Sequence, residues 1–288
     1  MKYLRTNITA ALLVVGFSLT ATPAQANLLV SYPDFTGACG SLTLTCVGDT
    51  TSPGTVLRVT PAATGKHGAA YSTTAVTLGA GNIFSTTFQF QFTNTGGIAP
   101  ADGITFVLAA NPTGLGGGGG GIGYVGVLNS VAIEFDTFNN GEVGGSNHVA
   151  VDTNGVLSNT GVSPYGANGA CATVGNTTLG CMSNGHVWTV NIGYDGALLD
   201  VTVQDAGNAG QHIINAFPID IGATLGTSNA FVGFTSGTGA GFANHDILNW
   251  RFADTTELAN VPGPDSLALL ALGLGLAGFG LGRRKRTK

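Results

Sequence analysis

The chain has 288 residues, of which 47 are glycine and only 9% are charged, and its formal net charge is −5 at pH 7. Three basic and fourteen acidic residues fall between positions 27 and 260, so this central part has a formal charge of −11. Such a surface repels phosphate backbones and attracts divalent cations, which argues against nucleic acid as a partner.

The N-terminus has the layout of a secretory signal peptide. Lys2 and Arg5 precede an apolar run over residues 8–19, and small residues follow at 24–26. This order predicts that signal peptidase removes residues 1–26 during export. A retained membrane helix is the alternative, but the apolar run is short for a span.

Four cysteines fall into two close pairs, Cys39 with Cys46 and Cys171 with Cys181. In a chain that is exported, such pairs predict two local disulfides. A zinc site is the competing interpretation, but neither pair has the spacing of a zinc motif and the nearby His186 stands alone.

Short stretches in which apolar and polar residues alternate recur along the central part, and glycine, asparagine, aspartate and proline separate them. They cover residues 83–92, 103–109, 131–138, 148–152, 187–192, 198–203, 231–235 and 247–252. This spacing predicts an all-β sandwich or jelly roll with one buried face on each sheet. No segment of useful length shows a helical period.

Residues 116–121 are all glycine, and such a run cannot pack a core. We expect a loop in which the backbone approaches a neighbour closely, or a flexible insertion. A phosphate-binding loop is excluded, because it requires a following helix and the next segment is a strand.

The segment from residue 131 to residue 140 carries the strongest chemical signal. Side chains alternate between the faces of a strand, so Val131, Ile133 and Phe135 share one face while Glu134 and Asp136 share the other. Two carboxylates that converge in this way repel each other, and a divalent ion removes the penalty.

Further oxygen and nitrogen ligands follow the two carboxylates. Asn140 offers an amide oxygen and Phe138 a backbone carbonyl, which suits Ca²⁺, while His148 could join Glu134 and Asp136 at a transition metal. The alternative is a solvated acidic face at the end of a strand.

We place the folded domain at residues 27–256. The C-terminal residues that follow it have the features of a sorting signal. Residues 257–265 are a linker with the proline-rich box Val261-Pro-Gly-Pro264, and residues 266–288 are apolar and then basic. This order resembles the PEP-CTERM sorting signal, which implies a transient transmembrane anchor, an exosortase-type processing enzyme, and release to the cell surface or matrix. Gly263 departs from the usual glutamate, and an ordinary single-pass anchor is the alternative.

Several motifs occur in the order found in L-type (legume-like) lectins. Glu134-Phe-Asp-Thr-Phe-Asn-Asn140 and Asn147-His-Val-Ala-Val-Asp152 resemble the metal-binding strands of that family. Ala101-Asp-Gly resembles its sugar-binding strand, and the stretches 121–126, 231–236 and 245–252 resemble its glycine loop and closing strands. The resemblance implies a concanavalin-like jelly-roll β-sandwich of two antiparallel sheets without catalytic activity.

The resemblance also implies the residues that contact carbohydrate. They are Asp102, Gly123, Phe138, Asn140, Ala240 and Gly241. Asp102 would accept hydrogen bonds from two sugar hydroxyls, Gly123 would donate its backbone N–H, and Phe138 would stack on the sugar ring. Asn140 would hold both Ca²⁺ and the sugar, and the peptide bond from Ala101 to Asp102 would be cis.

The implied metal site contains Ca²⁺ and a second, transition metal such as Mn²⁺. Its ligands would come from Glu134, Asp136, Phe138, Asn140, Glu142 and His148. The family usually places an aspartate between the asparagine and the histidine, but residues 141–147 contain none. Glu142 is the acidic candidate to replace it.

The sequence therefore predicts an exported, Ca²⁺-dependent lectin that binds a glycan or exopolysaccharide, with a homodimer as a further option. One alternative is a structural matrix protein that has the lectin fold without sugar binding. Another is a jelly-roll β-glucanase, but retaining hydrolysis needs a second carboxylate, and Asn139 and Asn140 stand at its position.

Overall fold

The structure is a computed structural model that describes residues 27–111, 114–164, 168–206, 211–256 and 258. Within these ranges almost all of the regular structure is β-strand, as the sequence predicts. The expected signal peptide, proline-rich box and apolar tail lie outside the described residues. Among the residues that are described, no helix has both the length and the apolar character needed to cross a membrane.

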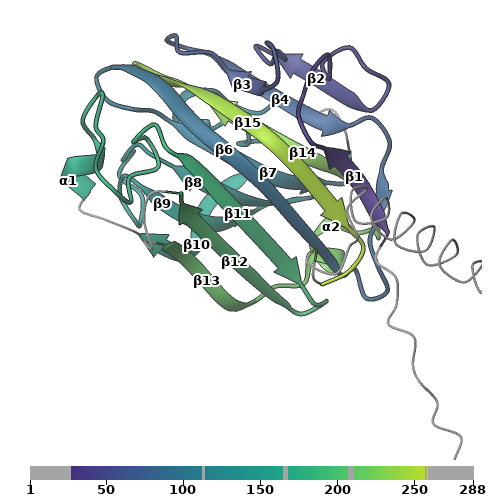
Figure 1. Ribbon diagram of the computed structural model, residues 1–288. Coiled ribbons are helices and arrows are strands. Elements are labelled where there is room, and N and C mark those ends of the chain that lie inside the picture. Colours follow the sequence, from purple (N-terminus) through teal and green to yellow (C-terminus); the bar gives the residue numbers. More distant parts are fainter. Residues whose placement is uncertain (1–26, 112–113, 165–167, 207–210, 257, 259–288) are drawn as a thin grey trace, which may run out of the picture.

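One antiparallel sheet has seven strands and is built around the two longest strands of the protein (Figure 1). Its order is β1 (Leu28–Tyr32), β15 (Gly241–Ala253), β6 (Phe84–Gly97), β11 (Val187–Tyr194), β12 (Leu198–Asp205) and β13 (Gln211–Pro218), and β3 (Leu57–Thr60) also pairs with β15. β6 and β15 pair along most of their length, which makes them the central ladder of this sheet.

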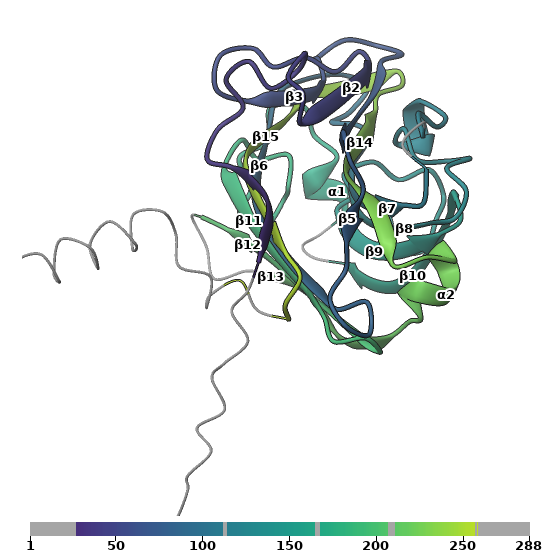
Figure 2. The same cartoon turned by 90° about the vertical axis from the view of Figure 1, so that its right-hand side faces the viewer.

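The other antiparallel sheet has eight strands and packs face to face on the first (Figure 2). Its order is β10 (Val156–Pro164), β9 (His148–Thr153), β8 (Ser130–Asp136), β7 (Gly103–Ala109), β14 (Asn229–Gly237), β4 (His67–Ser72) and β2 (Leu44–Gly48), and β5 (Val76–Thr77) pairs with β14. The acidic strand β8 thus lies between β7 and β9.

Three short helical turns connect the strands within the described ranges. They are η1 (Gly119–Gly121), α1 (Asn168–Cys171) and α2 (Ile221–Leu225). α2 begins after Asp220, whose side chain accepts a hydrogen bond from the Ala223 N–H at 2.8 Å, and it ends at Gly226 in the left-handed conformation. These turns were not expected from the sequence, because they are too short to show a helical period.

Aromatic side chains fill the space between the sheets. Phe88 and Phe90 of β6 meet Phe135 of β8 with ring centroids 5.7 and 5.5 Å apart, and Trp188 of β11 stacks on Phe90. Val131 and Ile133 join the same core, so the predicted alternation of β8 is confirmed on this face.

A second, smaller apolar cluster covers the outer face of the eight-stranded sheet. Tyr71 and Val107 of the sheet pack there with Tyr124 and Val127 of the loop that connects β7 to β8. The Tyr71 hydroxyl donates to the Gly114 carbonyl at 2.6 Å, which fastens the loop to the sheet. Both faces of β8 are therefore covered, and every residue of that strand is buried.

The eight predicted strands are all present, and both predicted disulfides, Cys39–Cys46 and Cys171–Cys181, are formed. A zinc site at the cysteines is therefore excluded. The strands that sequence reasoning missed are either six residues or shorter, as in β1 to β5, or lie at a sheet edge, as in β10 and β13. A short strand holds too few residues to establish an alternating pattern.

Candidate functional site

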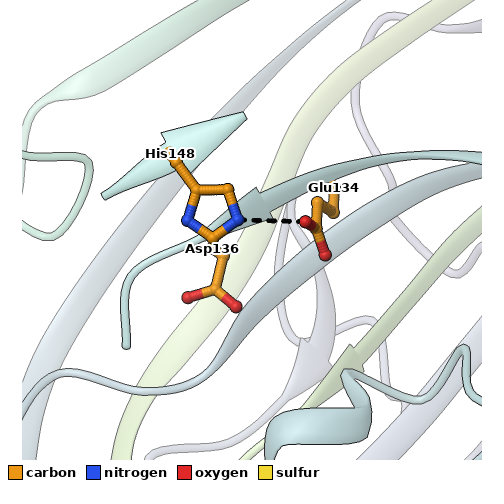
Figure 3. Close-up of side chains that lie close together, drawn as sticks. All are labelled: Glu134, Asp136 and His148. Carbon is orange, nitrogen blue, oxygen red and sulfur yellow. Dashed lines mark hydrogen bonds and ion pairs between the residues drawn. The ribbon is translucent and has the colours of Figure 1, made fainter. Parts of the chain in front are cut away.

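Glu134, Asp136 and His148 form a buried cluster at the ends of two neighbouring strands (Figure 3). Asp136 pairs with His148 across the β8–β9 ladder, and one ligand atom from each of the three residues lies within 4.8 Å of the others. Their exposed fractions are 0%, 2% and 0%. The alternative of a solvated acidic strand end is therefore wrong, because the outer face of the sheet is covered by loops.

The ring of His148 is oriented by hydrogen bonds at both nitrogens. Nδ1 lies 2.6 Å from the Gly145 carbonyl oxygen, which can only accept, so Nδ1 carries a proton. Nε2 then faces the Glu134 carboxylate at 3.0 Å and the Asn159 side-chain amide at 2.9 Å. Nε2 is thus the ring nitrogen that faces the carboxylates, and loss of its proton would free a lone pair there for a metal, which is the usual arrangement of a histidine ligand.

Two further polar residues border the cluster, and neither was predicted as a site residue. The Asp152 carboxylate accepts a hydrogen bond from the Asn159 N–H at 2.8 Å, and Asp152 is fully buried. Its place on the same face of β9 as His148 follows from the period of two, so the sequence contained this signal. Asn159 arrives from β10, and no local pattern indicated its contact with His148.

Burial perturbs the protonation of the carboxyl groups. Burial, followed by the charge of Glu134, raises the pKa of Asp136 well above its ordinary value. The same two causes raise the pKa of Asp152 to about 8. Burial lowers the pKa of His148, whereas its hydrogen bond to Glu134 and the charge of Glu134 raise it. The raising effects together outweigh burial, so the net shift of the pKa is upward. Acidic groups buried this closely favour a bound cation.

Unpaired polar atoms support the fit of a metal to this cluster. Among the described residues, Glu134 Oε2, Asp152 Oδ2 and Asp102 Oδ2 are buried and have no hydrogen-bond partner. A buried carboxylate oxygen without a partner is costly, whereas coordination of a cation satisfies it. Two carboxylates with one imidazole nitrogen are a donor set that suits a divalent transition metal.

Asp102 immediately precedes β7, and its backbone is held by the end of β14 and by the residue that follows β8. Its N–H donates to the Gly237 carbonyl at 3.1 Å, and its carbonyl accepts from the Thr137 N–H at 2.8 Å. The peptide bond from Ala101 to Asp102 is cis, as the resemblance implies. Burial raises the pKa of Asp102 to about 6, although hydrogen bonds from Asn140 and Gly239 lower it.

The loop after β8 links the acidic cluster to Asp102. The Phe138 N–H donates to Asp136 Oδ1 at 2.6 Å, and the Phe138 side chain is half-buried. The side chain of the exposed Asn140 lies close enough to Asp102 to lower the pKa of its carboxyl group, and the Asn140 N–H donates to Glu142 Oε1 at 3.0 Å. The charge of Glu142 raises the pKa of both Asp102 and Asp136, so Glu142 lies within electrostatic reach of both carboxylates.

The glycine loop approaches this site through other residues than Gly123. The Gly123 N–H donates to the Gly117 carbonyl at 2.8 Å, so the predicted contact from this N–H to a sugar is not supported. A Cβ atom on Gly120 would lie 2.5 Å from the Asn140 amide nitrogen, and one on Gly239 would lie 3.5 Å from Asp102 Oδ2. Sequence spacing alone could not tell these glycines apart.

Ala240 and Gly241 lie beside the segment that leads to Asp102. The Ala240 carbonyl accepts a hydrogen bond from the Ile98 N–H at 3.4 Å, and Gly241 pairs with Gly97. Ala240 is exposed, whereas Gly241 is buried. Both residues therefore border the Asp102 site, and only the first has a side chain at the surface.

A cavity of about 420 Å³ lies elsewhere, against the seven-stranded sheet beside Tyr194 and Asp200. None of the predicted site residues lines it. The convergence of buried carboxylates, and not the volume of a cavity, therefore identifies the candidate site.

Solved structures with the same architecture are lectins. The lectin from Bauhinia forficata in complex with GalNAc matches with a TM-score of 0.64 and 23% sequence identity, over 80% of this chain and 100% of that chain. The fold is therefore the lectin jelly roll, a two-sheet antiparallel sandwich.

Sequence comparison carries the assignment further. The model of the legume lectin domain matches residues 27–267. Favin from Vicia faba is 30% identical over 202 residues, which cover 65% of this chain and 75% of favin. The bark lectin from Styphnolobium japonicum is 31% identical over 202 residues, which cover 65% of this chain and 67% of that lectin. The chain belongs to the legume lectin domain family, whose fold binds carbohydrate and is not catalytic.

Proposed function

We propose that the protein is an exported lectin whose binding of a glycan depends on Ca²⁺. The observation that carries this proposal is the continuous path from the buried acidic cluster to Asp102. Asp136 accepts a hydrogen bond from Phe138, and the side chain of Asn140, two residues further, lies close enough to Asp102 to lower the pKa of its carboxyl group. A cation at the cluster would therefore act directly on the groups that meet a sugar.

The proposed metal ligands divide into two sets that share the acidic strand. Glu134, Asp136 and His148 would hold a transition metal such as Mn²⁺, the second metal of legume lectins. Asp136, the Phe138 carbonyl and Asn140 would supply oxygens to Ca²⁺, and Glu142 stands near enough to join them. The positive charge would keep the buried carboxylates ionised and the loop ordered.

The sugar would be bound by groups that are already in place. Ionised Asp102 accepts hydrogen bonds from two adjacent hydroxyls, and the Asn140 amide donates to one of them. Phe138 offers its half-buried ring for stacking on the apolar face of the sugar. The geometry favours Gly120 over Gly123 as the loop glycine at the site, because Gly120 lies against the Asn140 amide.

The test is a glycan array with the purified protein, with Ca²⁺ and Mn²⁺ or with EDTA, beside the variant Asp102→Asn. We expect binding to require the metals, and the variant, which loses the charged acceptor, to bind at least about tenfold more weakly. Asp200→Asn is the control, because Asp200 is an exposed carboxylate on β12, in the other sheet. Circular dichroism should show the sandwich intact in EDTA, since its core contains none of the metal ligands. Equal binding by Asp102→Asn and the parent protein would refute this use of the site.

One observation favours a second candidate, a structural matrix protein with the lectin fold. The Glu142 carboxylate bonds to the Asn140 N–H, and the link between Asn140 and His148 contains no aspartate to bridge two metals. If a folded, metal-loaded protein binds no glycan on the array, this candidate takes precedence.

We also propose that the chain crosses the inner membrane, loses its signal peptide and is anchored for a time by its C-terminal tail. The two disulfides support export, because such bonds form mainly in oxidising compartments. Signal peptidase and an exosortase-type enzyme would process the ends, and the mature lectin would bind glycan or exopolysaccharide at the cell surface or in the matrix. Pairing of two copies into a homodimer belongs to the same proposal.

A further inference from the structure

The loop between α1 and β11 is fastened at several points to the body of the protein. Cys171 and Cys181 join its two sides, and both cysteines are buried. The next residue, Met182, is fully buried and belongs to the main core between the sheets. The part of this loop around residue 181 is therefore a fixed element.

A buried aspartate holds the same part of the loop to β12. Asp205 Oδ2 accepts hydrogen bonds from the Gly180 N–H at 3.3 Å and from the Asn184 amide at 2.8 Å. Its other oxygen lies 2.8 Å from His186 Nδ1. Gly180 is thus held both by the adjacent disulfide and by β12 of the seven-stranded sheet.

The Asn147 side chain connects this fixed element to the segment that leads to His148 of the acidic cluster. The Asn147 amide donates to the Gly180 carbonyl at 2.8 Å, and its oxygen accepts from the Met182 N–H at 2.7 Å. Asn147 is fully buried and has a φ of 67°, a conformation that asparagine tolerates better than most residues. The contact joins positions more than thirty residues apart.

Asn147 immediately precedes His148, and the Gly145 carbonyl that orients the His148 ring lies two residues earlier. The His148 backbone and the partner of its Nδ1 therefore both belong to the segment that Asn147 holds. The chain from residue 141 to residue 147 lacks the usual aspartate and is rich in glycine, so it has little rigidity of its own.

We infer that Asn147 is a positioning residue for the metal site, and that the disulfide-linked loop of Cys171 and Cys181 is the support against which it holds His148. The inference rests on the proposed metal-dependent function and extends it to residues that touch neither metal nor sugar. Partners of this kind orient the ligands of a metal and contribute strongly to its affinity.

Two changes test the support from its two sides. Asn147→Gly removes both side-chain hydrogen bonds and keeps a residue that adopts positive φ without strain. The double change Cys171→Ser with Cys181→Ser releases the loop. The matched control is Cys39→Ser with Cys46→Ser, which opens a disulfide of similar size at β2, on the far edge of the eight-stranded sheet.

The measurement is the affinity of the full-length protein for Mn²⁺, followed by the electron paramagnetic resonance signal of the free ion. We expect Asn147→Gly and the Cys171 and Cys181 double variant to bind Mn²⁺ roughly 10- to 100-fold more weakly than the parent. The Cys39 and Cys46 double variant should match the parent. Hydrogen exchange of the metal-free proteins should be faster over residues 145–148 in the first two variants only.

The outcomes separate this inference from the proposed function. A parent protein that binds no Mn²⁺ refutes the metal site itself. A parent that binds, with Asn147→Gly binding equally well and exchanging no faster at residues 145–148, overturns the positioning role alone. If the cysteine variant does not fold, Asn147→Gly decides, because it leaves both disulfides in place.

Discussion

His245 is a fully buried histidine whose protonation state is set by its surroundings. Its Nδ1 lies 2.7 Å from the Thr60 hydroxyl and 2.9 Å from the Ser236 hydroxyl, and the edge of its ring meets Phe92. Burial alone lowers the pKa of His245 to about 3. The residue therefore remains neutral in the folded protein over the physiological range.

This shift predicts a pH dependence of the free energy of unfolding. Because the folded pKa lies below the unfolded value of about 6.5, the unfolded chain binds the extra proton first, and stability is lost as pH falls below about 6.5. The variant His245→Asn keeps a polar group but cannot take up this proton. We expect the stability advantage of the parent over the variant to shrink by about 1 kcal/mol between pH 6 and pH 5. Urea unfolding of both proteins, loaded with metal, measures it; a gap that does not change with pH would contradict the expectation.

At the scale of elements, the glycine loop and the end of β14 approach each other closely through their backbones. A Cβ atom on Gly237 would lie 2.6 Å from the Gly119 carbonyl oxygen, and Gly239 lies against both Gly119 and Asp102. Glycine is required here because two backbones meet where a side chain would otherwise stand. The sequence indicated close approach in this loop but not which glycines make it.

Two alanine substitutions in this loop should differ in their effect on glycan binding. Gly120→Ala places a methyl group 2.5 Å from the Asn140 amide and should displace it, whereas Gly117→Ala meets its nearest atom at 3.8 Å. We expect Gly120→Ala to weaken glycan affinity about tenfold, since one or two hydrogen bonds to the sugar are lost. Titration calorimetry gives the affinities, and thermal melting should show both variants folded. Equal affinities for the two variants would place Asn140 outside the sugar site.

At the scale of the whole molecule, the candidate sugar site and the ends of the domain lie at opposite ends of β15 (Figure 1). Gly239 and Ala240 precede the strand, whereas the Asn27 N–H donates to Asp254 at 2.9 Å just beyond its last residue. A strand of this length spans roughly 40 Å. A chain anchored by its tail would therefore present the site away from the membrane.

Processing of the ends gives the prediction at this scale. We expect the protein isolated from the outside of the cell to begin at Asn27, because the small residues at positions 24–26 suit signal peptidase. We expect it also to lack the apolar and basic residues that follow the proline-rich box. Intact mass spectrometry determines both ends. A mature chain that keeps its basic C-terminus would favour the ordinary single-pass anchor.

The sequence by itself determined the sheet class, most of the long strands, both disulfides and the shared face of Glu134 and Asp136. These features depend on local rules: alternation along a strand, and cysteines close enough in the chain to meet whatever the fold. The same rules could have added Asp152, which follows His148 at an even spacing on one strand. Motif order supplied Asp102 and Asn140, which local rules do not connect.

Only the tertiary structure decided the environment of those residues. Burial of the acidic face depends on a loop that packs over the sheet, where its Tyr124 meets Tyr71 of β4, and no pattern within β8 records it. The contact of Asn147 with Gly180, and of Gly120 with Asn140, join segments that are distant in the chain. Such contacts form only where loops pack against the assembled β-sandwich. They depend on tertiary packing, and the neighbouring residues in the sequence do not predict them.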